Sequence, residues 1–402
     1  MRHLLSNVAL CFPVLFLMKA SMRSTSFLPI LCTCFSFALH QVTEAQVNKS
    51  PYQFTEIFRI GDESAGDTIL FRSHLHSQIS VNSNGQLFVG GGWRESPIMS
   101  FSDRGDFAGY LGAVGAGPGD FRKSTSEIIG LDDSIYVFDR ELNRLVVFDP
   151  KTLQYVYSRT TVNAESNFSS PSELLGVTKK GYLYKFDTPY RPSGNEWGIE
   201  PDDPRTSVIN FIDWQDVKVQ HPMAELPATE RLIKTQESSI TVMLRPFGRS
   251  PFFVFKNGVL YAGWNDTINI SIISDMGEQI QIIKAEHEAQ SVTRKELESI
   301  VASNHMEENH QVILQSELIP ETKPAYDAMV VDDHGHIWIR KYPDTGAELA
   351  LWMIIGSDNK LVGEMELPSN LLLKTIQGGR AYASVESEIY GPYIVVYSIS
   401  SK

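Results

Sequence analysis

Cysteine is almost absent from this sequence. The 402 residues contain three cysteines, Cys11, Cys32 and Cys34, and all of them precede residue 45. The rest of the chain therefore has no disulfide, no thiolate nucleophile and no cysteine-based metal site. An exported chain without disulfides fits a bacterial periplasm or cell surface better than a disulfide-rich extracellular module.

Basic runs are also missing. The chain carries 35 Lys and Arg residues against 48 Asp and Glu residues, which gives a net charge of −13. An acidic surface repels phosphate backbones, so we expect no nucleic acid partner. Hydrophobic residues make up 42% of the chain, which is enough to bury the core of one large domain or two ordinary ones.

Compact catalytic motifs are absent as well. The sequence has no Gly-x-Ser-x-Gly elbow, no His-Glu-x-x-His helix and no phosphate-binding loop. The glycine-rich stretch Gly115–Gly119 precedes no helix that would point backbone amides at a phosphate. We interpret it as a tight crossing between structural units.

The first 45 residues have the features of an export signal. Two apolar runs, Val8–Met18 and Phe27–Leu39, each follow basic residues, and neither is clean or long enough for a membrane span. Small residues Thr43 and Ala45 suit cleavage after Ala45, which leaves Gln46 as the mature N-terminus. We therefore expect a leader at 1–45, an exported domain at 46–402, and no stable membrane span after cleavage.

Two other fates of this leader stay open. One is an N-terminal anchor helix that remains attached. The other is lipidation at Cys34, which has Leu31 three residues before it, although the intervening Cys32 and Thr33 fit a lipoprotein box poorly. The expected location is in each case outside the cytoplasm: periplasmic, cell-surface or extracellular.

A repeated hairpin organises the rest of the chain. Residues 329–340 predict a strand, a tight turn at Asp332–Gly335 and a second strand, with Gly335 supplying the positive φ of the turn. A second hairpin follows most copies, so each unit has four antiparallel strands, and six such units predict a six-bladed β-propeller. The six copies of the first hairpin are 79–89, 129–139, 175–184, 253–261, 329–340 and a weaker one at 375–383.

The two ends of this region complement each other. Residues 371–399 supply three strands, and Phe54–Ile60 alternates like a lone outer strand, so we expect the N-terminal strand to complete the last blade. Two insertions interrupt the repeat. Thr293 and Glu296 form a capping box that predicts a short helix near 293–304, and the Pro-, Gly- and Asp-rich segment Thr188–Asp216 predicts a long loop.

These repeated sequence segments resemble those of the bacterial six-bladed propellers related to NHL-repeat proteins. The resemblance rests on Val331–Ile339, Gly115–Phe121 and Phe138–Asp149, and it covers nearly all of Phe54–Ile399. It implies an all-β propeller fold and an exported protein. Related propellers include calcium-dependent lactonases, quinone-dependent dehydrogenases and peptide-amidating lyases, so the resemblance alone selects no activity.

The loops that follow each second strand carry the candidate binding residues. Aromatic side chains, arginines and an amide on one concave rim suit a small polar ligand, a glycan or a peptide, or a protein partner. The leading hypothesis is therefore a binding or scaffold protein without catalytic chemistry. The candidates are Trp93, Arg94, Arg140, Tyr190, Arg191, Trp264, Asn265 and Arg340.

The alternative is a divalent-cation-dependent hydrolase or lyase of the lactonase kind. Asp139, Asp187 and Asp266 supply carboxylates that suit calcium, but their spacing forms no motif. His334 and His336 lie two residues apart without an evident third ligand. We accordingly expect no metal site and no cofactor, with calcium as the alternative, and the sequence leaves the ligand open.

The leader yields a direct prediction. Because cleavage after Ala45 fits the small residues at 43 and 45, the mature protein from its native cell is expected to begin at Gln46 and to lie outside the cytoplasm. Mass spectrometry of the N-terminal peptide measures this. Recovery of an intact Met1 in the cytosol would contradict it.

Overall fold

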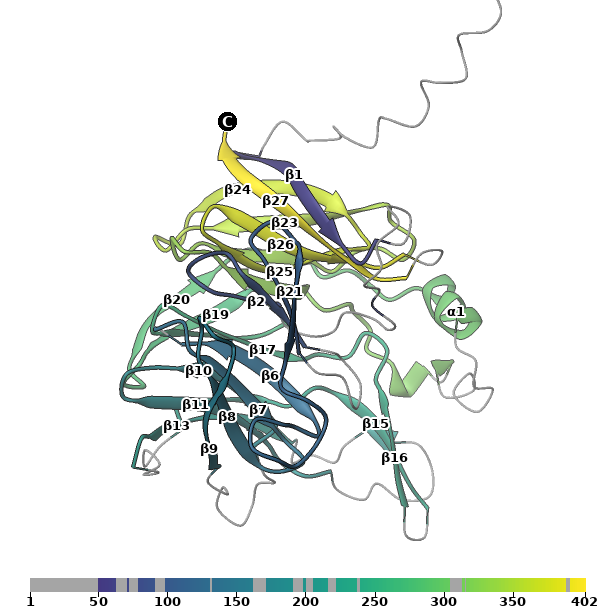
Figure 1. Ribbon diagram of the computed structural model, residues 1–402. Coiled ribbons are helices and arrows are strands. Elements are labelled where there is room, and N and C mark those ends of the chain that lie inside the picture. Colours follow the sequence, from purple (N-terminus) through teal and green to yellow (C-terminus); the bar gives the residue numbers. More distant parts are fainter. Residues whose placement is uncertain are drawn as a thin grey trace, which may run out of the picture. The chain divides into compact units, whose positions relative to one another are not determined.

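Figure 1 shows the computed structural model of the chain. The chain divides into two units, Met1–Ala45 and Gln46–Lys402, and the second contains all of the strands named below. The structure describes residues 50–62, 71, 79–90, 98–130, 132–161, 171–190, 198–199, 205–215, 222–236, 239–303, 313–314, 316–387 and 391–402.

Most of the described strands belong to six four-stranded antiparallel sheets, here called blades 1 to 6 in chain order. Blade 1 contains β2 (Ile79–Val81), β3 (Leu87–Val89), β4 (Ile98–Phe101) and β5 (Phe107–Leu111). Blade 2 contains β6 (Ser124–Ile129), β7 (Ile135–Asp139), β8 (Arg144–Phe148) and β9 (Tyr155–Thr160). Blade 3 contains β10 (Glu173–Val177), β11 (Gly181–Asp187), β13 (Thr206–Asp213) and β14 (Ala224–Pro227).

The second half of the chain repeats the arrangement. Blade 4 contains β17 (Pro251–Lys256), β18 (Val259–Trp264), β19 (Asn269–Ser274) and β20 (Gln279–Lys284). Blade 5 contains β21 (Tyr326–Val331), β22 (Ile337–Lys341), β23 (Leu349–Ile355) and β24 (Leu361–Pro368). Blade 6 contains β25 (Leu371–Gln377), β26 (Arg380–Val385), β27 (Tyr393–Ser401) and, from the other end of the chain, β1 (Tyr52–Ile60).

The insertions hold more structure than the sequence indicated. The segment Thr188–Asp216 is not only a loop, because it contains β13, the third strand of blade 3, and the short β12 (Gly198–Ile199). β12 pairs with a hairpin of β15 (Arg231–Gln236) and β16 (Ser239–Leu244) in a separate three-stranded sheet. Turn formers dominate the composition of this segment and concealed the apolar run inside it.

A short helix lies close to its expected position. The helix α1 spans Arg294–Ser303, and Thr293 and Glu296 form the capping box, with Glu296 N donating to Thr293 Oγ1 and Thr293 N donating to Glu296 Oε2. A 3₁₀ turn, η2, follows at Ser316–Leu318. In the parts of the chain that the structure describes, no helix combines the length and the apolar character needed to cross a bilayer.

The first strand of each blade contacts the first strands of its two neighbours. The order of these contacts is β2, β6, β10, β17, β21, β25 and back to β2, so the six inner strands form a closed cycle. The chain is therefore a six-bladed β-propeller, as its repeated hairpins predict.

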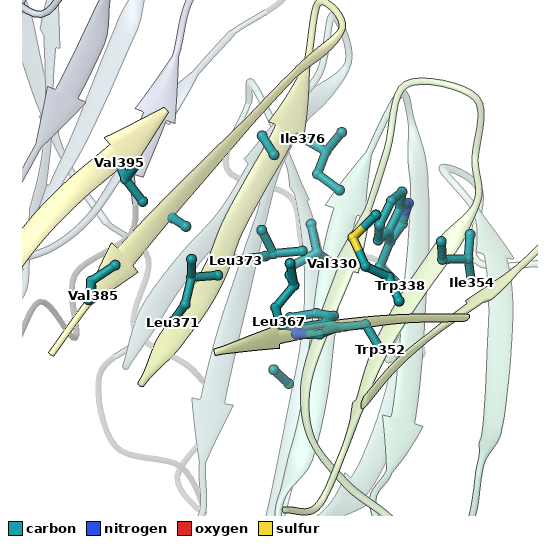
Figure 2. Close-up of a cluster of buried hydrophobic side chains, with 14 residues drawn as sticks. Val330, Trp338, Trp352, Ile354, Leu367, Leu371, Leu373, Ile376, Val385 and Val395 are labelled. Carbon is teal, nitrogen blue, oxygen red and sulfur yellow. The ribbon is translucent and has the colours of Figure 1, made fainter. Parts of the chain in front are cut away.

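Six apolar clusters form the core of the propeller, one between each pair of neighbouring blades, and two smaller clusters involve α1, η2 and the β15–β16 hairpin. Figure 2 shows the cluster between blades 5 and 6, where Trp338 and Trp352 lie against Leu371 and Leu373. Both tryptophans are almost fully buried. Aromatic side chains fill the widening space between two splayed sheets with large rigid area. Each blade thus depends on both neighbours for the burial of its two faces.

The strand β1 pairs antiparallel with β27 and is the outer strand of blade 6 (Figure 1, purple beside yellow). The register runs from Tyr52 opposite Ser401 to Ile60 opposite Ile394. Its inward side chain Phe54 packs on Trp338 of blade 5, with the ring centroids 6.0 Å apart. The earliest strand of the described chain therefore contributes to the seam between the last two blades.

The turn Asp332–Gly335 shows why the repeated hairpin is so regular. Gly335 adopts a φ of 79°, and the buried Asp332 carboxylate accepts hydrogen bonds from the backbone N–H groups of His334 and His336. Its Oδ2 also lies 3.1 Å from Trp338 Nε1 and from His336 Nδ1. One carboxylate thus closes the turn and satisfies the indole of the neighbouring strand.

Removal of this carboxylate is expected to destabilise the protein. Asp332→Ala leaves the Trp338 indole N–H buried without a partner, so the free energy of unfolding should fall by about 1–3 kcal/mol. Asp332→Asn keeps one acceptor oxygen and should lose less of the free energy of unfolding. Urea unfolding followed by tryptophan fluorescence measures both.

The matched control is Asp358→Ala, in the second hairpin of the same blade. Asp358 Oδ1 accepts from Lys360 N in the same kind of turn, but both side chains are exposed. An equal loss in Asp332→Ala and Asp358→Ala would show that the indole contact contributes nothing.

Candidate ligand-binding site

The propeller has two faces, set by the direction of its strands. The turns from first to second strand, such as Asp332–Gly335, lie on one face, here called the turn face. The loops from second to third strand and the crossings between blades lie at the other ends of the strands, here called the loop face. The described candidates lie on the loop face: Trp264 and Arg340 are near the ends of their second strands, and Arg140, Tyr190 and Asn265 follow theirs. Trp93, Arg94 and Arg191 lie outside the described residues.

Arg340 uses its hydrogen-bond donors within blade 5 and toward the start of blade 6. Its Nε and Nη2 lie 2.7 Å from the two carboxylate oxygens of Asp327, and its Nη1 donates to the carbonyls of Ser369 and Leu371. Burial raises the pKa of Asp327, while the Arg340 guanidinium acts in the opposite direction. The bidentate pair joins β22 to β21 within blade 5, and the two carbonyl contacts hold the start of the first strand of blade 6.

Asn265 and Trp264 also have structural partners. The Asn265 side chain is 3% exposed, accepts from Ser250 N at 2.7 Å and donates to the Tyr326 carbonyl at 2.8 Å. Trp264 is the half-buried last residue of β18, opposite Pro251. Asn265 thus ties blade 4 to the first strand of blade 5.

Tyr190 is the described candidate with a solvent-exposed ring. Its side chain is 37% exposed, and the guanidinium of Arg205 lies 4.1 Å from the ring centroid. Arg205, which the sequence did not single out, lies across the insertion from Tyr190 and also donates to the Thr229 carbonyl. Arg140 is exposed, and its backbone N–H donates to the Lys123 carbonyl. These contacts lie in different blades and do not gather the described candidates at one point.

A cavity of about 800 Å³ lies where the six inner strands meet at the turn face. Every blade contributes to it, through its first strand and the turn that follows. The apolar part of the wall comes from Ile79, Val81, Ile128, Ile129, Leu175, Val177, Phe253, Val254, Phe255, Met329, Val330 and Val331. Because β17 is half-buried along its whole length, its side chains face this space as well as the core.

The wall between blades 3 and 4 depends on a glycine. A Cβ built on Gly176 would lie 2.1 Å from Cδ1 of Phe255, so the ring occupies the space that any side chain at this position would need. The ladder of β10 shifts register between Leu174 and Gly176, which brings the bare backbone under the ring. Gly176 therefore fixes an aromatic side chain in the wall of the cavity.

Charged side chains ring the cavity at the level of the turns, and most of them are paired across blades. Lys256 Nζ lies 3.0 Å from Asp333 Oδ1, and Asp333 Oδ2 accepts from Gly378 N at 2.6 Å. Lys180 pairs with Asp275 at 3.0 Å. Ser83 donates to Asp133 from both its backbone N–H and its hydroxyl. These bonds join the turns of neighbouring blades around the opening.

The sequence analysis missed this cavity for a physical reason. Its wall residues are the same alternating apolar residues that form a blade core, so nothing in their types marks them as partly exposed. The signal that was available is a charge within an inner strand, at Lys374, which directly follows Leu371, Leu372 and Leu373. The residues that the structure describes include no group of three or more His, Cys, Asp or Glu side chains placed to hold a metal ion.

Comparison with known proteins supports the fold. Residues 74–198 match the model of a family described as a 6-bladed beta-propeller. No curated protein matches the sequence. The resemblance of the sequence to six-bladed propellers is thereby confirmed, while its NHL-like character stays a prediction.

Solved structures with similar folds are distant in sequence. A Bacteroides fragilis protein described as exported is 11% identical, covering 88% of this chain and 96% of that chain, with a TM-score of 0.49. A DUF4221 family member from Bacteroides vulgatus is 10% identical over 88% and 99%, with a TM-score of 0.49. Virginiamycin B lyase from Staphylococcus aureus is 12% identical over 86% and 98%, with a TM-score of 0.39.

Glu127 on the inner strand β6 yields a pH-dependent prediction. The side chain is 3% exposed, and burial raises its pKa to about 8, although its Oε1 accepts from Gly90 N at 2.9 Å. Between about pH 4.5, the usual value for Glu, and pH 8, the folded protein holds a proton that the unfolded chain has lost. Stability should therefore fall as pH rises through this window, by up to about 1.4 kcal/mol per pH unit.

Glu127→Gln keeps an acceptor for Gly90 N and removes the titration, so the contribution of this residue to the pH dependence should disappear. Urea unfolding at pH 5 and pH 8 measures the difference. Glu141→Gln, at an exposed loop residue, is the control. If the free energy of unfolding changes with pH to the same extent in wild type and Glu127→Gln, the prediction is wrong.

Proposed function

We propose that this chain is an exported propeller that binds a small ligand with an apolar body and a polar group in the cavity at its centre. The observation that carries the proposal is the cavity of about 800 Å³, to which all six blades contribute. Its volume is within the range of small-molecule sites in proteins, which are mostly apolar with a few placed polar groups. The leader expected at 1–45 supports the exported location.

The cavity is favoured over the loop-face residues because of what their side chains do. The donors of Arg340 and Asn265 are committed to contacts within blade 5 and with neighbouring blades, and a ligand would have to compete for them. The hypothesis that a glycan or peptide binds on the loop face stays a prediction, since Trp93, Arg94 and Arg191 are beyond the described part of the chain.

A cavity-filling substitution tests the proposal. Thr375 is half-buried and lines the cavity from β25, so Thr375→Trp should occupy ligand space. The probe is N-phenyl-1-naphthylamine, a neutral aromatic dye whose fluorescence rises in apolar sites. We expect saturable binding to the wild type and a loss of affinity of about tenfold or more in Thr375→Trp, or ~1.4 kcal/mol.

The matched control is Ile282→Trp, on the outer strand β20, where the side chain is 38% exposed. Equal binding to wild type and Thr375→Trp, with both folded by circular dichroism, would refute the cavity as the site. The cation-dependent alternative has its own outcome in the same assay: calcium would raise the melting temperature and a chelator would reverse the rise.

A further inference from the structure

Lys374 occupies an unusual position in the wall of the cavity. It lies in the inner strand β25, where the ladder with β26 shifts register between Leu373 and Thr375, so Lys374 is the extra residue of a β-bulge. The next turn is at Gly378 and Gly379, four residues further along the strand. At ~3.3 Å per residue, its backbone lies roughly 13 Å below the turns.

The other charged residues of the cavity differ from Lys374 in depth. They lie in turns or at a strand end, and several of them form ion pairs between blades. Lys374 is half-buried, and its side-chain amine makes no hydrogen bond or ion pair with any residue that the structure describes. Below the turns, the cavity wall is thus mostly apolar, with Ser80 and Thr375 as small polar residues and Lys374 as the charged one.

No carboxylate of the described residues contacts the Lys374 ammonium group. Burial lowers the pKa of Lys374 to about 8, Glu386 acts to raise it, and Arg340 acts to lower it. Arg340 is itself bound by both oxygens of Asp327. At neutral pH the amine is still mostly protonated, and a buried cation is stabilised by an anion that reaches it.

We propose that Lys374 binds the anionic group of a small amphipathic acid, a carboxylate or sulfonate, whose apolar body lies against the inner strands. This inference rests on the proposed function, since it names the ligand class of the same cavity. The bulge supports it, because an irregular ladder re-aims a side chain at a functional position. A ligand of this class would satisfy both parts of the wall, the apolar strands and the amine.

Two dyes with the same aromatic body test the assignment. The first is 8-anilinonaphthalene-1-sulfonate, which carries an anion, and the second is N-phenyl-1-naphthylamine, which does not. Lys374→Met should weaken binding of the sulfonate by about 10- to 100-fold, the usual range for loss of a charged hydrogen bond, and leave the neutral dye within about twofold. Lys374→Arg should retain sulfonate binding.

The pH dependence gives a readout that needs no variant. A bound anion favours the protonated amine, so sulfonate affinity should be full below pH 8 and decline above it in the wild type. In Lys374→Arg the decline should disappear, because a guanidinium stays charged. Lys360→Met is the control, since Lys360 is exposed and pairs with Asp358 on an outer turn.

The outcomes separate this inference from the proposed function. If Thr375→Trp removes both dyes but Lys374→Met changes neither, the cavity binds ligands and the role of Lys374 is refuted. If sulfonate affinity is flat from pH 7 to pH 10 in the wild type, the role of Lys374 is refuted as well. If Thr375→Trp leaves both dyes bound, or the wild type binds neither with saturation, the cavity and the inference fail together.

Discussion

The structure depends on one packing requirement: every sheet has two apolar faces, and each must be buried against a neighbouring sheet. Six sheets meet this requirement in a cycle, which is why six separate clusters form in place of a single central core. The large side chains Trp338 and Trp352 fill space between blades 5 and 6. Polar side chains such as Arg340 and Asn265 then bond to the backbone of the neighbouring blade.

The same requirement creates the cavity. Most side chains of an inner strand pack in the seams between blades, so the inner strands leave a space between them that only some side chains line. The interior of the propeller is therefore hollow for geometric reasons, and the chain determines only how the hollow is lined. Lys374 introduces a charge into that lining, and the bare backbone at Gly176 admits the ring of Phe255.

Much of the fold could be predicted because the turn chemistry is local. Asp332 and Gly335 identify a hairpin from four adjacent residues, and the repetition of that hairpin counts the blades. β13 was missed because the prolines and glycines around it outweighed the run Val208–Ile212.

The binding site was harder to predict than the fold, because the type of a residue does not reveal which groups its side chain contacts. Arg340 and Asn265 resemble ligand-binding side chains in sequence, yet Arg340 bonds to Asp327 of its own blade and to the first strand of the next, and Asn265 bonds to the neighbouring blade. Lys374 fell within the strands expected for the last blade, but its residue type alone did not distinguish it from an outward-facing lysine.

The pairing of β1 with β27 has a consequence for how the chain folds. The two strands come from opposite ends of the described chain, so their contact closes almost the longest loop that the chain can form. Blades 1 to 5 each complete their four strands from nearby sequence, but blade 6 waits for its partner from the start of the chain. Until then β27 presents an unpaired edge and Trp338 lacks the cover of Phe54. We therefore expect this blade to be completed late, and the unfinished propeller to expose a strand edge to which another chain can add.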